Sequence, residues 1–411
     1  EEIKQEQKQK GIDFKEKGLS RIVIYQLSPT EYTCVWICHH ILLDGWSAVN
    51  LINELFERYE NSIHNKHIEY QRIPSVATIN AAINQIDELQ GSSYWKDNFG
   101  DYVRPKSIPA KRQEKNFEKI TTTISAEDLR EIKLIGKQLK TTVSSLLQLA
   151  WGITLCKLYD TKDIVYGVTG SGRNLPLEGI EDVAYLLTNT LPLRFQHDDA
   201  HLSELIKKLD AQKVNNLKRE NDHLSDIEKW IEWHENSPLI ESVFTFANYP
   251  WKPVVSEDFT IKNLVGDYSS THSLTLMLFE DSELTASLVH DTNMIPQESA
   301  EKLLAFFKNT AQMMCEPGFN VEQLLHGEQQ FELLSENTLT RKNQDKKEYR
   351  EPSNSTELFL NRIWQEVLGI TAISNNQDFF RLGGTSVQAL RICLAIEKET
   401  GNYFNPTALL L

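Results

Sequence analysis

The feature that most constrains the fold is a break in the hydrophobic pattern at TRKNQDKKEYREPSNST, residues 340–356. This stretch is almost wholly charged or polar and contains a proline, so it indicates a linker between folded units. A chain of 411 residues that is 40% hydrophobic is long enough for two or three domains. We therefore expect a large unit that ends near residue 335, a linker over 336–355 and a small unit over 356–411.

Composition excludes several classes of function. The formal charge of −15 disfavours nucleic acid or an anionic membrane as a partner, because phosphates would be repelled over most of the surface. Apolar runs such as VWIC and LTLML are far shorter than the roughly 18 residues that a membrane helix needs. The five cysteines form no CxxC pair and no zinc-site spacing, and the N-terminal EEIKQEQKQKG lacks the apolar core of a signal peptide. We expect reduced thiols in a cytoplasmic protein.

The large unit mixes strand and helix patterns in no strict βαβ alternation, which predicts the α+β class. Alternation over RIVIYQL and YTCVWICHH, around the turn SPTE, predicts a hairpin that runs into two histidines. A helix with Ser47 as its N-cap should follow. Further helices are predicted over 125–140, with Ser125 as cap, 142–159 and 201–218, and further strands over DIVYGVTG, TNTLPLRF, ESVFTFANY, HSLTLMLF and ELTASLVH.

The small unit should be helical. Thr356 is a candidate cap for ELFLNRIWQEVLG, and a second helix should start near Ser386, directly after LGGT. Two glycines let the backbone turn or approach closely, and a phosphate ester on Ser386 would lie beside free backbone N–H groups at the positive end of a helix. On spacing alone, a simple N-cap is the commoner role of such a serine.

The wider string DFFRLGGTSVQALRI is similar to the peptidyl carrier domains of nonribosomal peptide synthetases. This resemblance implies that Ser386 carries 4'-phosphopantetheine, attached by a phosphopantetheinyl transferase. It also implies that the residues before the serine order its loop, and it leaves the last helix of such a domain missing from this chain. Val387 stands where the family more often has Leu. The loop residues are Asp378, Phe379, Phe380 and Leu382.

The two histidines fall at the end of the hairpin, in CHHILLDGWS. If the strand continued through them, their side chains would point to opposite faces, so only one ring could line a given cavity. An HH pair on an apolar strand is more often one packed ring and one incidental ring than a catalytic group. A metal site at these histidines is less favoured still, because the sequence suggests no third ligand nearby.

The full string resembles the HHxxxDG signature of condensation domains, which have two lobes like chloramphenicol acetyltransferase. The stretch from Gly167 to Arg194 resembles the family's second-lobe segment, with Tyr185 where a glycine is usual, which could narrow the tunnel. HLSDIEKW and SPLIESVFTFANY resemble its later, weaker motifs. The resemblance covers about residues 12 to 330. It implies a first lobe over 1–115, truncated at its start because the family's first motifs are absent from residues 1 to 38, and a second lobe over 116–335.

The family's residue roles carry over to this chain as follows. The resemblance implies that His40 faces the reacting groups and is the catalytic residue, and that the other matched residues support it structurally. It also implies that Asp44 pairs with an arginine of the second lobe, for which Arg173 is the best candidate. Whether His40 acts as a general base or positions the amine stays open. The supporting residues are His39, Asp44, Gly45, Arg173 and Asn189.

These resemblances predict a condensation and carrier didomain that joins an acyl or peptidyl thioester, held on an upstream carrier protein, to an acceptor amine. No adenylation domain separates the two units, so an adenylating enzyme should act in trans. One alternative is a chain-release or ester-forming domain that uses a soluble amine or alcohol. The other alternative is a catalytically degenerate domain that only docks carriers. Epimerisation is disfavoured because such domains follow a carrier, and heterocyclisation because its paired aspartates are absent.

Overall fold

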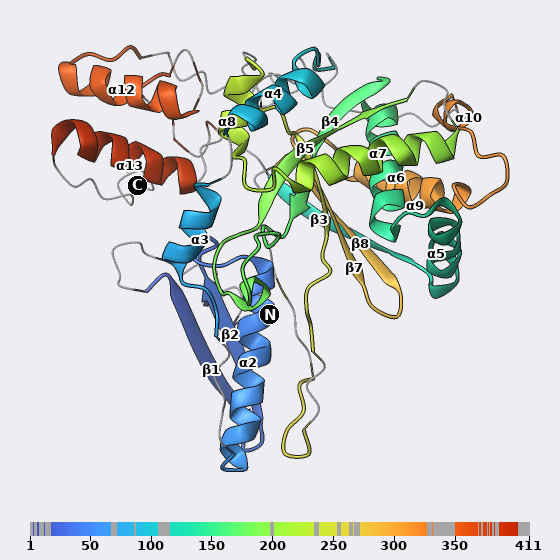
Figure 1. Ribbon diagram of the computed structural model, residues 1–411. Coiled ribbons are helices and arrows are strands. Elements are labelled where there is room, and N and C mark those ends of the chain that lie inside the picture. Colours follow the sequence, from blue (N-terminus) through green and yellow to red (C-terminus); the bar gives the residue numbers. More distant parts are fainter. Residues whose placement is uncertain are drawn as a thin grey trace.

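The computed structural model describes residues 3, 6–7, 12, 18–66, 72–85, 88–105, 116–197, 201–233, 238–252, 256–262, 266, 272–326, 331, 350–368, 370, 373–375, 377, 379, 382 and 386–401. In these residues, a small two-stranded sheet, a six-stranded sheet and a pair of helices follow one another along the chain (Figure 1). Strands and helices do not alternate strictly, which confirms the predicted α+β class. None of the described helices has the length and apolarity needed to cross a bilayer.

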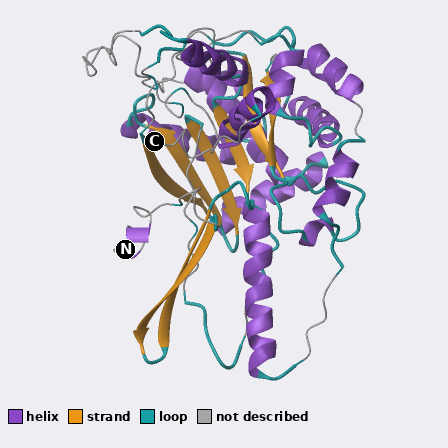
Figure 2. Cartoon of the chain, turned by 90° about the vertical axis from the view of Figure 1, so that its left-hand side faces the viewer, coloured by secondary structure: helices purple, strands orange, loops and turns teal. Residues whose placement is uncertain are grey.

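The first sheet is an antiparallel hairpin of β1 (Ser20–Ser28) and β2 (Glu31–Cys38), followed by α2 (Gly45–Ile63) and α3 (Val76–Ile83). Figure 2 shows the hairpin and the long helix projecting from the rest of the molecule. Alternate β1 side chains are exposed, among them Ile22 at 56% and Ile24 at 66%. An isolated two-stranded hairpin is only marginally stable, so the contacts that α2 makes elsewhere in the chain matter for this lobe.

The second sheet has the strand order β3-β8-β7-β6-β4-β5. The pairs β4–β6 and β6–β7 are parallel, and the other neighbours are antiparallel. All the strands predicted here from the sequence are present, and the sheet has one more, β3, which the prediction missed. The strands are β3 (Phe117–Ile124), β4 (Asp163–Gly170), β5 (Asn189–Gln196), β6 (Ser242–Phe246), β7 (Leu274–Glu280) and β8 (Leu284–Asp291).

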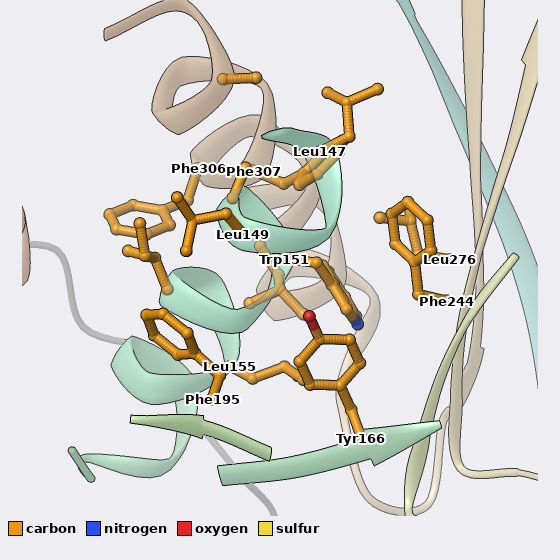
Figure 3. Packing of buried hydrophobic residues seen from close by; sticks show 14 of the residues in the cluster. Leu147, Leu149, Trp151, Leu155, Tyr166, Phe195, Phe244, Leu276, Phe306 and Phe307 are labelled. Carbon is orange, nitrogen blue, oxygen red and sulfur yellow. The ribbon is translucent and has the colours of Figure 1, made fainter. Parts of the chain in front are cut away.

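Helices on one face of this sheet enclose the main core. The central one is α6, in which every residue from Ser145 to Cys156 is buried. Figure 3 shows Trp151 of α6 beside Tyr166 of β4. The polar ends of these rings are satisfied, because Trp151 Nε1 donates to Ser242 Oγ and Tyr166 Oη to the carbonyl of Gln148. The helices are α5 (Ala126–Leu139), α6 (Val143–Tyr159), α7 (Leu202–Leu217), α9 (Gln297–Met313) and α10 (Val321–Leu325).

Two helices pack on the other face, at its β4–β5 end: α4 (Glu88–Phe99) and α8 (Leu224–Trp230). Their core includes Trp95 from α4 together with Val165, Leu191 and Val243 from the strands. The range 1–115 was predicted as the first lobe, yet α4 lies inside it and packs on the second sheet. A short 3-10 helix, η1 (Ile180–Asp182), lies between β4 and β5.

The small C-terminal unit contains α12 (Ser355–Leu368) and α13 (Ser386–Thr400). Phe379 is 1% exposed and meets Trp364 edge to face at 5.3 Å, inside a core that both helices share. Most of the predicted linker lies outside the described residues. Arg350, near its end, donates its backbone N–H to Ser374 Oγ at 2.8 Å and so already belongs to this unit.

Three local predictions were wrong. In each case the backbone hydrogen bonds of the structure differ from those that the prediction assumed. β2 ends at Cys38, so the strand alternation does not reach the histidines. Asp44, not Ser47, is the N-cap of α2, since its side chain accepts from Ser47 N. Asn354, not Thr356, caps α12, since Asn354 Oδ1 accepts from Glu357 N. The cap predicted at Ser125 for α5 agrees with the structure, and Thr142, predicted only as the first residue of the next helix, is the N-cap of α6.

Candidate active site

The two histidines occupy a turn between β2 and α2. His39 N donates to Leu19 O at 2.8 Å, which prolongs the hairpin by one bond, and Leu42 N donates to His39 O at 3.0 Å, which turns the chain. His39 is half-buried, and its Nδ1 accepts from Ile41 N at 3.1 Å, whereas His40 is exposed. The structure therefore gives the two rings different surroundings: His39 is tied to the local backbone and His40 is accessible.

Burial lowers the pKa of His39, and the neighbouring His40 adds to this effect. An imidazole that accepts a backbone hydrogen bond at Nδ1 must be unprotonated there, so its neutral form carries the proton on Nε2. His39 is thus held at the start of the turn as a neutral ring with its proton on Nε2.

Asp44 connects the start of α2 to the second sheet. Its Oδ1 accepts from Ser47 N at 2.7 Å, and its Oδ2 accepts from the backbone N–H groups of Leu187 and Thr188, both at 3.0 Å. Arg173, from the segment after β4, binds the same carboxylate with Nη1 at 2.9 Å and Nη2 at 3.1 Å. The two side chains are 0% and 2% exposed. The structure therefore brings Asp44 and Arg173 together as a buried, bidentate ion pair between the lobes.

Burial by itself would raise the pKa of Asp44. The hydrogen bond from Arg173, the bonds from Ser47 and the Arg173 charge outweigh it and lower the pKa of Asp44 to about 2. The carboxylate is consequently ionised at neutral pH, and Asp44 holds structure rather than accepting a proton.

Ser47 is a site residue that the sequence analysis assigned only to capping. Its Oγ lies 2.7 Å from Tyr185 O, to which it donates, and it accepts from Tyr185 N at 3.0 Å and from Arg173 Nη2 at 2.9 Å. Its position two residues after the Asp-Gly pair was the only signal in the sequence. We call Asp44, Ser47 and Arg173 the interlobe latch.

An apolar cluster supports the interlobe latch. It joins Ile79 of α3 to Leu175, Ile180, Val183 and Leu187 of the segment between β4 and β5. The ring of Tyr185, the residue that replaces the family's glycine, packs against this cluster. α3 and the β4–β5 segment are far apart in sequence, and this cluster packs them together. It thereby keeps the residues of the interlobe latch in contact.

Two glycines near the latch permit close approaches. Gly45, the first residue of α2, lies under Tyr249, whose Oη would be 2.5 Å from an added Cβ. Tyr249 ends the string SPLIESVFTFANY, which resembles one of the weaker family motifs, but the sequence analysis did not assign it to this site. Gly172 has φ +68°, and a Cβ there would overlap the carbonyl oxygen of Leu187. The residue before Arg173 therefore has to be glycine.

Asn189 begins β5 and holds a neighbouring turn rather than the histidines. Its Nδ2 donates to the carbonyls of Glu220 and Asp222, both at 2.8 Å. Asp222 in turn accepts from Trp95 Nε1 at 2.7 Å, which connects α4 to this turn. Asn189 thus supports the second sheet where α4 and α8 cover it.

Ser386 is the first residue of α13. Of the residues expected to order the loop before it, Phe379 and Leu382 are buried in the core of the small unit. Asp378, Phe380, Gly383 and Gly384 lie outside the described residues.

Comparisons with known proteins agree with this geometry. The family described as "Condensation domain" matches residues 1–334. The chain belongs to this family. A second family, "Phosphopantetheine attachment site", matches residues 359–410. The chain is therefore a condensation domain followed by a carrier domain, the kind of domain to which 4'-phosphopantetheine is covalently attached.

Similar proteins include peptide synthetases. Bacitracin synthase 1 of Bacillus licheniformis is 26% identical over 76% of this chain and 6% of its own length. Gramicidin S synthase 2 of Brevibacillus brevis is 25% identical over 76% of this chain and 7% of its own length. The condensation–carrier chain thus spans a small fraction of these relatives. Its fold is similar to the first condensation domain of the calcium-dependent antibiotic synthetase, with a TM-score of 0.61 at 14% identity over 77% of this chain and 71% of that one.

Proposed function

We propose that the chain forms an amide bond between a carrier-bound acyl or peptidyl thioester and an acceptor amine, with His40 as its catalytic residue. The observation that carries this proposal is the exposed imidazole of His40 at a turn fixed on both sides, by the backbone bonds of His39 and by the interlobe latch. The order of the two domains, condensation domain before carrier, adds support.

In this reaction the amine nitrogen bonds to the thioester carbonyl carbon, the C–S bond breaks and the sulfur leaves as a thiol. The attacking nitrogen must lose a proton, which a neutral imidazole can accept or hold by a hydrogen bond, because the ordinary pKa of histidine is near 6.5. A positioned base is typically worth about 10²- to 10⁴-fold in rate. The latch contributes indirectly, since it fixes the turn that presents His40.

Ser386 fits the role of the modified serine. It begins a helix of 15 residues whose first turn contains no acidic side chain, so the start of α13 favours a phosphodiester. When bound there, 4'-phosphopantetheine supplies a flexible arm that ends in a thiol for the thioester. The residues of α13 then hold the attachment point, and Phe379 and Leu382, which precede it in the sequence, are buried in the core of the small unit.

A contact between the two domains favours an acceptor tethered to the chain's own carrier. Arg391 of α13 donates from Nη1 to Ser225 Oγ of α8 at 2.8 Å. This hydrogen bond joins the helix that begins with Ser386 to α8 of the condensation domain; Figure 1 shows where α13 and α8 lie. A soluble acceptor would need no such contact.

The partners follow from this chemistry. An upstream carrier protein would present the donor thioester, an adenylating enzyme would load this carrier in trans, and a phosphopantetheinyl transferase would modify Ser386. We place the reaction in the cytoplasm, because all five cysteines are free thiols.

The test is amide formation measured by product mass spectrometry with a loaded donor carrier. His40→Ala should lower the rate at least about 10²-fold, while intact mass still shows the pantetheine arm on Ser386. His326→Ala, which changes an exposed histidine after α10, should leave the rate unchanged. Wild-type product formation by His40→Ala would refute the assignment of His40.

Two further variants test the acceptor. Ser386→Ala should stop product formation from a tethered acceptor, and Arg391→Ala should slow it. Neither change should affect turnover of a soluble amine offered at high concentration. If product from the natural acceptor survives Ser386→Ala, the acceptor is soluble and the chain is a release or ester-forming domain.

A further inference from the structure

Three side chains with metal-binding atoms meet near the C-terminal end of α2. His64 Nε2 lies 3.3 Å from Glu60 Oε1 and 3.0 Å from Asp258 Oδ2. Glu60 belongs to α2, His64 is its C-cap residue, and Asp258 comes from the segment between β6 and β7. All three donor atoms lie within 4.8 Å of one another, and no other described residues form such a group of three.

The positions of these side chains are fixed by their surroundings. Glu60 and His64 are four residues apart, so they share one face of the helix. The second carboxylate oxygen of Glu60 accepts from Ser256 Oγ at 2.5 Å, and Ser256 Oγ also accepts from Asp258 N at 3.0 Å. Phe259 packs on Phe56 and Tyr59 of α2, at ring distances of 5.8 and 5.2 Å. Asp258 is therefore held on α2 from both sides.

The distances suit a tetrahedral ion. Bonds of about 2.0–2.2 Å from Zn²⁺ to nitrogen and oxygen place neighbouring ligand atoms about 3.3–3.6 Å apart, close to the separations around His64. Two carboxylates and one neutral imidazole give the site two negative charges, which a divalent cation would balance. Ser256 holds the free oxygen of Glu60, as outer partners of metal ligands do.

We propose that Glu60, His64 and Asp258 bind Zn²⁺, with water as the fourth ligand. The ion joins α2 to a segment that leaves the second sheet at β6. The interlobe latch already joins the first residues of α2 to that lobe, so the metal site attaches the opposite end of a helix about 28 Å long. The two attachments together fix the direction of α2 and of the turn that carries His40.

The test uses the full chain, freed of metal by a chelator and titrated with Zn²⁺ in a calorimeter and with Co²⁺ in a visible spectrometer. We expect one equivalent of Zn²⁺ to bind and to raise the thermal midpoint. Bound Co²⁺ should show a tetrahedral d–d spectrum without a thiolate charge-transfer band. His64→Gln and Asp258→Asn should each weaken binding at least tenfold and abolish the rise in midpoint.

His326→Ala is the matched control. His326 also lies four residues after a glutamate, Glu322, at 3.1 Å, but Lys162 shares that carboxylate. This variant should bind Zn²⁺ as the wild type does. The proposal is overturned by absence of stoichiometric binding in the wild type, by undiminished binding in His64→Gln, or by a thiolate band that places the ion on cysteine. It is equally overturned if Zn²⁺ leaves the midpoint unchanged, which would leave these residues as an ion pair only.

Discussion

Removing the positive charge of Arg173 should destabilise the protein far more than removing an exposed charge. Arg173→Met keeps most of the side-chain volume but leaves the Asp44 carboxylate buried without its partner. Breaking a buried ion pair on one side typically costs about 3–5 kcal/mol. The control is Lys302→Met, because Lys302 pairs with Glu298 at 2.6 Å on the surface of α9. Its loss should cost less than about 1 kcal/mol.

The measurement is the free energy of unfolding from urea titrations followed by tryptophan fluorescence. The double variant Asp44→Asn with Arg173→Met should lose less than the sum of its single variants, since neither charge then lies buried alone; the coupling should be about 1–3 kcal/mol. Equal stabilities of Arg173→Met and Lys302→Met, or strict additivity in the double variant, would refute the view that the latch is one coupled unit.

The latch also predicts a pH dependence. The pKa of Asp44 is about 2 in the folded chain, against 3.8 for an ordinary aspartate. A lowered pKa means that the folded state favours the ionised form, so the stabilisation is complete above pH 3.8 and is lost as the pH falls towards 2. The difference is close to two pKa units, which corresponds to about 2 kcal/mol. Asp44→Asn should lack this part of the acid dependence.

Three further changes test the packing around the site. Gly172→Ala should cost more than about 3 kcal/mol, because its Cβ would overlap Leu187 O, whereas Gly318→Ala, at a similar φ with open space around it, should cost only about 1–2 kcal/mol; urea titrations compare them. Ser47→Ala should cost about 1–3 kcal/mol by the same assay, because it leaves buried partners unsatisfied. His39 favours its neutral form on folding, so its contribution to stability should be complete above pH 6.5 and should fall at lower pH; an NMR titration of the ring should show the lowered pKa.

Much of the fold could be predicted because local sequence patterns determine where most of its helices and strands lie. The strand DIVYGVTG was predicted with the bounds that β4 has, and α5 and α7 begin and end one residue inside their predicted ranges. β3 was missed because FEKITTTI has an exposed, largely polar face, and only its pairing with β8 marks it as a strand. The end of β2 before the histidines was also missed because tertiary contacts decide it. The backbone hydrogen bond from His39 N to Leu19 O and the turn after it set the point at which the strand ends.

The sequence by itself determined which residue types stand together: two histidines before an Asp-Gly pair, a serine after two glycines, and a polar stretch between two units. These patterns are local, and local propensities and family motifs are sufficient to recognise them. Tertiary structure alone decided that Ser47 completes the latch, that Tyr249 covers Gly45 and that Asp258 meets His64. Each of these contacts joins residues more than 100 positions apart, and only the packing of the two lobes around α2 brings them within bonding distance.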